Sequence, residues 1–199
     1  NKIARRNSLT PHKNAISDTS LAVSISAATQ EDLYDLIPLV KKYRDCMIKG
    51  EGGSSPTRKN LNSRNKPYNS AQKRRDLDAS EFRQFIADQI RRSVFLIART
   101  KTVGEKGIPI GFLRLFESVS VLELSHTFDL HDLYVLPNFR KHRVATRLIQ
   151  EAEKMCGRDW KSFAIEVANV GLNNNPAMQL FGSLGYKQDA ECEVYIKEL

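Results

Sequence analysis

The stretch that decides the fold is LHDLYVLPNFRKHRVATRLIQ, residues Leu130–Gln150. It begins with an apolar run rich in strand-forming side chains, Leu130, Leu133, Tyr134, Val135 and Leu136. Pro137 ends this strand because proline has no N–H to donate to a sheet. After a short turn, apolar side chains recur at helical spacing: Val144, Ala145, Leu148, Ile149 and Ala152. The stretch therefore predicts a strand, a tight turn and a helix that begins at His142.

Basic side chains gather where this helix is predicted to begin: Arg140, Lys141, His142 and Arg143. A helix N-terminus presents unpaired N–H groups and a partial positive charge, so it attracts anions. Added cations strengthen that attraction, and we interpret this corner as a phosphate site. The alternative is an ordinary strand-turn-helix crossover with a solvated basic corner.

Two segments carry a family resemblance. Residues Arg140–Ala145 resemble the acyl-CoA-binding motif of the GNAT superfamily of N-acyltransferases, Gln/Arg-x-x-Gly-x-Gly/Ala, which follows a strand and a short turn. Arg143 stands where that motif has its first glycine. Residues Asn174–Tyr186 are similar to the family's Asn-x-x-Ala-x-x-Leu-Tyr-x-x-x-Gly-Phe segment. Two motifs at this separation are more specific than either alone, and the resemblance covers about residues 21–199.

Length and composition indicate one globular domain. The 199 residues suffice for a single core, with 41% hydrophobic and 27% charged residues. We expect a flexible polar tail over 1–20 and one domain over 21–199. The sequence shows no run long enough for a membrane span and no signal-peptide core. Three scattered cysteines suit a reducing compartment, so we predict a cytoplasmic protein without a metal site.

The net charge of +8 favours anionic partners such as the phosphates of CoA. Much of the excess lies in the tail and in a basic loop predicted over 50–78. The sequence has no basic stripe interleaved with aromatic residues and no nucleic-acid motif, so we expect neither a nucleic-acid nor a membrane partner. A homodimer is compatible with these features. The loop is either a solvated insertion or part of the acceptor site.

The remaining patterns predict the order of elements. Apolar alternation or runs predict strands over 21–26, 94–98, 110–116, 128–136, 163–167 and 193–197. Helical spacing predicts helices over 29–50 with a kink at Pro38, from Ser80, from His142 and over 176–184. The GNAT resemblance implies this order: an α/β (α+β) fold with a mixed, mostly antiparallel sheet of six to seven strands. It also implies a V-shaped splay between strands four and five and about four flanking helices.

The resemblance implies acetyl-CoA as co-substrate and a set of residues that hold it. In the family, the pantetheine arm pairs with the backbone of the splayed fourth strand, here Leu133, Tyr134 and Val135. The turn and helix start surround the pyrophosphate, which implicates Arg140, Lys141, His142, Arg143, Val144, Ala145 and Thr146. Residues from the second motif flank the pantetheine end: Asn174, Ala177 and Phe181.

The catalytic base is sought on the same strand. Residues Leu130–Val135 resemble the fourth strand of diamine acetyltransferases such as spermidine/spermine N-acetyltransferase, where a Glu matches His131 and an Asp matches Asp132. An imidazole titrates near neutral pH and suits a general base, and Asp132 would attract a cationic amine. The alternatives are a solvent-facing strand histidine and a backbone-bonded turn acid. Asp129 and Glu166 are weaker candidates for the base.

The general acid departs from the family pattern. Phe181 stands where the family commonly has the tyrosine that protonates the departing thiolate. Tyr186 and Tyr134 are the candidate substitutes, with Tyr186 preferred, and a thiol needs less help to leave than an amine would.

The sequence therefore predicts an acyltransferase: an acetyl-CoA-dependent N-acetyltransferase acting on a primary amine of a small molecule, by direct attack in a ternary complex. One alternative is a protein acetyltransferase acting on a lysine or an N-terminus, with the basic loop docking the partner. Another is a non-catalytic CoA-binding module, which Phe181 and Arg143 motivate.

Overall fold

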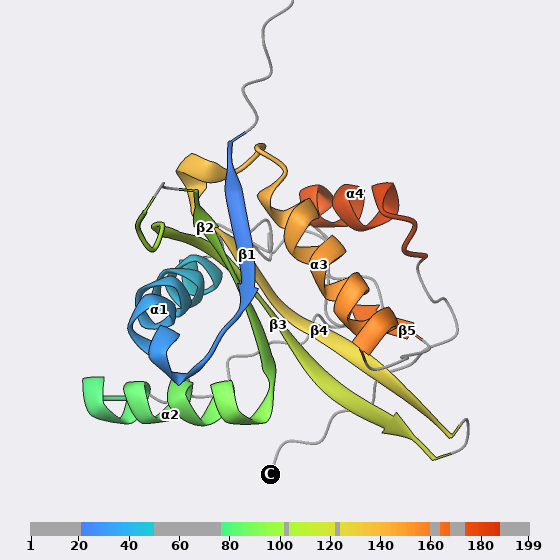
Figure 1. Ribbon diagram of the computed structural model, residues 1–199, viewed down its shortest axis with the longest axis horizontal. Coiled ribbons are helices and arrows are strands. Elements are labelled where there is room, and N and C mark those ends of the chain that lie inside the picture. Colours follow the sequence, from blue (N-terminus) through green and yellow to red (C-terminus); the bar gives the residue numbers. More distant parts are fainter. Residues whose placement is uncertain are drawn as a thin grey trace, which may run out of the picture.

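A computed structural model describes residues 21–49, 77–101, 104–121, 124–159, 164–167 and 174–187 (Figure 1). Short 3-10 turns, Gln30–Asp32 and Pro137–Phe139, precede the first and third helices. The described elements run in the order β1 (Val23–Ala27), α1 (Leu33–Lys49), α2 (Ala79–Arg92), β2 (Val94–Thr100), β3 (Pro109–Ser120), β4 (Ser125–Val135), α3 (Val144–Asp159), β5 (Ala164–Val167) and α4 (Asn175–Ser183).

The described strands form one sheet in the order β1-β2-β3-β4-β5. Neighbouring strands are antiparallel except β4 and β5, which are parallel. Helices α1 and α2 cover one face of the sheet, and α3 and α4 cover the other (Figure 1). The predicted mixed sheet with four helices is confirmed, with five strands in the described part of the chain. The tail over 1–20, most of the predicted loop over 50–78 and the predicted strand over 193–197 lie outside the described residues.

Residues 110–115 of the central strand β3 are buried on both faces, which explains the nearly continuous apolar sequence there. Leu113 and Leu115 face α3, where they pack with Leu148 on that helix. Phe112, on the alternate side of the strand, packs with Leu36 of α1 on the opposite face. A charged residue in such a buried segment needs a partner. Arg114 is the charged residue in this part of β3.

The helix starts follow from local hydrogen bonds. Asp78 caps α2 by accepting from the N–H groups of Ser80 and Glu81. Pro38 lies inside α1 without ending it. Helix α3 begins at Val144 rather than at His142 as predicted, because Lys141 and Arg143 have left-handed backbones with φ of 62° and 58°. No described helix has both the length and the apolar character that crossing a membrane requires.

Strand β4 is paired differently along its two edges. Its full length from Ser125 to Val135 pairs with β3, whereas its described pairing with β5 covers only Thr127–Leu130. The register with β3 shifts where Arg114 faces Asp132 and Leu115 faces Leu130, so His131 is the extra residue of a β-bulge. The described part of β5 ends at Val167, so the predicted splay of the fourth and fifth strands, which would lie beyond Leu130, stays a prediction.

Candidate active site

A cavity of about 290 Å³ lies where β4 ends and α3 begins. Both motifs found in the sequence contribute to its walls, which are Val135, Phe139, Arg140, Lys141, Arg143, Val144, Ala145, Thr146, Pro176 and Leu180. The fold thus brings the start of α3 next to α4, although the two segments are far apart in the sequence. Seven of these residues belong to the set that the resemblance implicates in CoA binding. We call this cavity the corner cavity.

The backbone at the corner cavity is held in an unusual conformation. Lys141 and Arg143 both lie in the left-handed region, which costs an L-residue about 1–2 kcal/mol. Arg143 therefore adopts the kind of conformation that a glycine takes freely, at the position where the related motif has glycine. Turns of this kind next to a helix start gather backbone N–H groups into a concavity that suits anions. The substitution by arginine preserves the turn and adds an exposed cation beside it.

The cationic side chains of this corner have different roles. Arg140 donates from Nε to the Val135 carbonyl oxygen at 3.0 Å, and its guanidinium lies 5.8 Å from the centre of the Tyr134 ring. Arg140 therefore ties the turn to the end of β4. The side chains of Lys141 and Arg143 are exposed and line the cavity. His142 is exposed but does not line it.

The second motif contributes different side chains from those predicted. Asn174 caps α4 by accepting from the Ala177 N–H at 3.3 Å. Ala177 is half-buried and Phe181 is buried, and both belong to the core under α3. The residues of this helix that line the corner cavity are Pro176 and Leu180. The segment singled out in the sequence therefore lines the cavity through other residues than Asn174, Ala177 and Phe181.

The two residues predicted to act at the amine lie on the same face of the sheet. The ring of His131 is exposed and packs edge-on against Phe116, with ring centres 4.8 Å apart. The Arg114 guanidinium lies 4.1 Å from the centre of that Phe116 ring and forms an ion pair of 3.2 Å with Asp132. The bulge therefore places His131 and Asp132 around a shared pair of β3 side chains.

Tyr186, the predicted general acid, does not lie near His131 and Asp132. Tyr186 packs against Phe181, with ring centres 5.4 Å apart, in the core under α3 on the other face of the sheet. Burial, followed by the carboxylate of Glu153, raises the pKa of Tyr186. The other candidate, Tyr134, is buried toward α1 among aromatic rings.

The weaker base candidates, Asp129 and Glu166, occupy paired positions of β4 and β5. The two strands are paired at that point, whereas the bulge at His131 lies just beyond the end of their described pairing.

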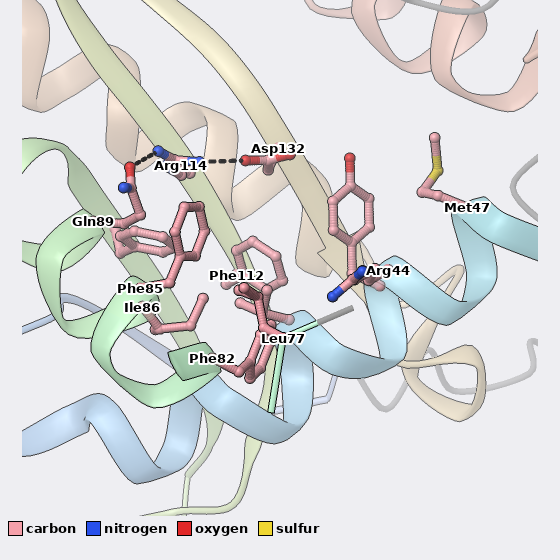
Figure 2. A pocket seen from close by; sticks show the side chains of 13 residues that line it. Arg44, Met47, Leu77, Phe82, Phe85, Ile86, Gln89, Phe112, Arg114 and Asp132 are labelled. Carbon is pink, nitrogen blue, oxygen red and sulfur yellow. Dashed lines mark hydrogen bonds and ion pairs between the residues drawn. The ribbon is translucent and has the colours of Figure 1, made fainter. Parts of the chain in front are cut away.

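A second cavity, of about 630 Å³, lies between the sheet and helices α1 and α2 (Figure 2). We call it the acceptor-side cavity. Its walls come from both helices, from the residue that precedes α2, and from the adjoining faces of three strands: Val40, Tyr43, Arg44, Met47, Leu77, Phe82, Phe85, Ile86, Gln89, Phe95, Phe112, Arg114 and Asp132. Among these residues, the sequence predicted a functional role only for Asp132. Arg114 could have indicated this cavity, because it is a lone cation within the otherwise apolar residues 110–116.

Arg114 organises the polar end of the acceptor-side cavity (Figure 2). Its guanidinium donates to Asp132 at 3.2 Å, to the Gln89 side chain, and from Nε to Ser93 Oγ at 3.1 Å. Burial and the Asp132 carboxylate also raise the pKa of Tyr43 on the neighbouring helix. The Asp132 carboxylate is therefore held in place beside the bulge at His131.

The mixed sheet with a cavity on each face agrees with a match to a known protein family. Residues 59–186 match the family model described as Acetyltransferase (GNAT) family. The chain belongs to this family. The matched GNAT region contains β4, α3 and α4, so it includes both motifs and all residues of the corner cavity.

Individual GNAT relatives are distant. The chain is 30% identical over 98 residues to an uncharacterized N-acetyltransferase, YhfO, of Bacillus subtilis, a match that spans 49% of this chain and 60% of that relative. A crystal structure of a probable acetyltransferase superimposes with a TM-score of 0.65 at 26% identity, covering 88% of this chain and 97% of that one. The aminoglycoside N-acetyltransferase AAC(6')-Iy in complex with CoA has the same fold, with a TM-score of 0.61, 16% identity and coverage of 96% and 100%.

Proposed function

We propose that this chain transfers the acetyl group of acetyl-CoA to a primary amine of a small molecule within a ternary complex. One observation carries the proposal: the two cavities lie on opposite faces of the sheet and both reach β4, one at Val135 and the other at Asp132. Between these two residues, β4 has no described partner on β5. A linear arm that runs between β4 and β5 beyond Leu130 would connect the two cavities.

The corner cavity has the donor groups that a diphosphate needs. Acetyl-CoA supplies an acetyl group activated as a thioester. Lys141 and Arg143 present two cations, and α3 opens at Val144 with unpaired N–H groups directed toward the cavity. Charge-assisted hydrogen bonds from such groups to phosphate oxygens are among the strongest in proteins. The open edge of β4 at Leu133–Val135 has backbone groups that suit the amides of the pantetheine arm.

The bulge at His131 is the expected place of reaction. His131 takes a proton from the attacking ammonium, and the amine nitrogen then bonds to the carbonyl carbon as the carbon–sulfur bond breaks. The nitrogen loses its second proton to solvent, which leaves a neutral amide. The peptide groups at the bulge lie outside the regular ladder, so a backbone N–H there can stabilise negative charge on the carbonyl oxygen. Asp132 lies next to the bulge and attracts the substrate ammonium, while Arg114 holds its carboxylate in position.

The leaving thiolate needs no dedicated tyrosine in this account. Phe181 has no proton to give, and it is only 8% exposed in the core. A thiol has a pKa of only about 8.5, so its thiolate is a good leaving group near neutral pH. The sulfur then takes its proton from solvent.

The size of the acceptor-side cavity supports a small-molecule acceptor. Its volume of about 630 Å³ lies in the range of pockets that enclose small ligands, about 300–1,000 Å³. Several neighbours by fold are also described as aminoglycoside acetyltransferases, one of them in complex with sisomicin.

A thiol-release assay tests the proposal. The full chain is mixed with saturating acetyl-CoA and with monoamines, polyamines, aminoglycosides, amino acids and short peptides, and mass spectrometry identifies acetylated products. We expect amine-dependent release of free CoA. If acetyl-CoA binds but no amine of the panel accelerates thiol release, the proposed transfer reaction is wrong.

A further inference from the structure

The acceptor-side cavity is mostly apolar, with Gln89, Arg114 and Asp132 at one end and Arg44 on the side of α1. Nine of its thirteen lining residues are aliphatic or aromatic. Figure 2 shows Phe82, Phe85 and Ile86 projecting from α2, with Phe112 on the adjoining strand, while the ion pair of Arg114 and Asp132 lies at the other end. The cavity therefore has an apolar body and a polar end that contains the residue next to the bulge.

The charge on the cavity walls does not suit a polycation. The charged residues among the described lining are Arg44, Arg114 and Asp132, two cations and one anion. The single carboxylate is already paired with Arg114 at 3.2 Å. One ammonium group can share the carboxylate of Asp132, but further ammonium groups on the same molecule would meet guanidinium groups and apolar walls. Charged groups without a partner are strongly disfavoured in such surroundings.

Two large apolar side chains of the cavity are left in contact with water. Phe85 is 47% exposed and Met47 is 42% exposed, although both line the cavity. Contact with an apolar ligand would remove this surface from water and would favour binding. Aromatic rings also pack well against one another in offset or edge-on arrangements, and Phe82 and Phe112 provide further ring surface nearby.

We propose that the acceptor is an arylalkyl primary amine with a single positive charge, rather than a polyamine or an aminoglycoside. This inference rests on the proposed acetyl transfer. The ammonium group lies beside Asp132 and the bulge at His131, where the thioester is reached. The aromatic body lies between α1 and α2, against Phe82, Phe85 and Met47. The bond chemistry is that of amide formation with release of free CoA.

Two variants on exposed apolar residues test the substrate class without touching the buried core. Phe85→Glu places a carboxylate on the cavity wall, whereas Val119→Glu makes the same kind of change on β3, at a residue that is 61% exposed and does not line the cavity. Acetylation of 2-phenylethylamine, spermidine and kanamycin is measured with saturating acetyl-CoA. Calorimetry of 2-phenylethylamine with the CoA-loaded protein measures binding independently of turnover.

We expect kcat/KM to be at least about tenfold higher for 2-phenylethylamine than for spermidine or kanamycin. Either the loss of one apolar contact or the burial of one charge without a partner is enough for a tenfold difference. Phe85→Glu should lower the affinity and kcat/KM for 2-phenylethylamine by about tenfold or more, and Val119→Glu should change neither. Binding of 2-phenylethylamine that is sensitive to Phe85→Glu, without thiol release by any amine, would support the ligand class and refute acetyl transfer. A preference for spermidine or kanamycin, or binding of 2-phenylethylamine that Phe85→Glu leaves unchanged, would overturn the inference.

Discussion

Arg114 on β3 and Asp132 on β4 occupy paired positions of adjacent strands and form an ion pair of 3.2 Å. The register shift that accommodates His131 follows immediately after this pair. The side chains are only 14% and 23% exposed, and the guanidinium is also enclosed by the rings of Phe95 and Phe116. The pair therefore connects the structure of the bulge to the polar end of the acceptor-side cavity. Its strength determines how firmly the Asp132 carboxylate is held.

The first prediction concerns the energy of this pair. A double-mutant cycle of Arg114→Ala and Asp132→Ala, measured by urea unfolding, should give a coupling free energy of about 1–2 kcal/mol. Lys154 and Glu151 on α3 provide a matched control, because their N···O distance is also 3.2 Å but their side chains are 66% and 35% exposed. That cycle should give less than about 0.5 kcal/mol. Equal coupling in both cycles would show that burial does not strengthen the pair.

The second prediction concerns the strain at Arg143. Arg143→Gly should be more stable than Arg143→Ala by about 0.5–1 kcal/mol, because only glycine is relaxed at a φ of 58°. Arg147, an exposed residue inside α3, is the control, since Arg147→Gly should be less stable than Arg147→Ala by about 1 kcal/mol. Urea unfolding measures both differences. The same order at both positions would contradict the left-handed conformation of Arg143.

The third prediction concerns the charge of the corner cavity. Replacing both Lys141 and Arg143 by alanine should weaken acetyl-CoA binding by about tenfold or more, because charged hydrogen bonds to phosphate are lost. The loss should shrink as ionic strength rises. The double variant Arg91→Ala and Lys154→Ala removes the same charge from exposed positions outside both cavities, and calorimetry should show little change. Equal weakening in the two double variants would indicate a general charge effect.

The fourth prediction separates two histidines of β4. His131→Ala should lower kcat about 100-fold or more at neutral pH and leave acetyl-CoA binding unchanged, because general-base catalysis typically contributes at least that factor. His126 is also exposed and lies near the other end of β4, where its Nδ1 is 2.7 Å from Oε1 of Glu117. His126→Ala should leave kcat unchanged. An unaltered kcat in His131→Ala would mean that His131 is not the base.

The fifth prediction concerns stability in acid. Burial opposes ionisation of Asp32 and Asp35, but a backbone hydrogen bond from Thr29 to Asp32 and the cations Arg99 and Lys106 outweigh it, so the pKa values of both carboxyls fall below the usual 3.8. A lowered folded-state pKa stabilises the fold above the unfolded pKa, and this stability is lost as the pH falls below about 3.8.

Urea unfolding between pH 6 and pH 2 should therefore show a decline in stability concentrated below about pH 4. The double variant Asp32→Asn and Asp35→Asn should be less stable at pH 6 and should decline less steeply in acid. Parallel curves for the two proteins would show that these carboxyls do not carry the acid dependence.

The strands, the helices and the corner cavity were predictable because they depend on local patterns. Apolar runs, Pro137 and the basic turn all act within a few residues of one another, and the motif places the start of α3 near its true position. The exact start was wrong by two residues because the left-handed backbone of Arg143 carries no signal in an arginine. A glycine at that position would have indicated it.

The acceptor-side cavity was not predictable in the same way. It forms where α1, α2 and the sheet meet, so Phe82 and Phe112 read from the sequence as ordinary core residues until their neighbours are known. Tyr186 illustrates the same limit. It was the preferred substitute for the hydroxyl that Phe181 lacks, but the path of the chain turns its ring toward α3, away from His131. Arg114 was the one available clue, because a cation in a buried strand requires a partner.

A crystal structure of the protein with CoA tests the central claim most directly, namely that one linear arm passes between β4 and β5 beyond Leu130 and joins the two cavities. The account predicts the pyrophosphate against the N–H groups that open α3 at Val144. It also predicts the pantetheine arm along Leu133–Val135 and the sulfur next to the bulge at His131. CoA bound elsewhere, or β4 and β5 paired continuously beyond Leu130 with the cofactor present, would contradict it.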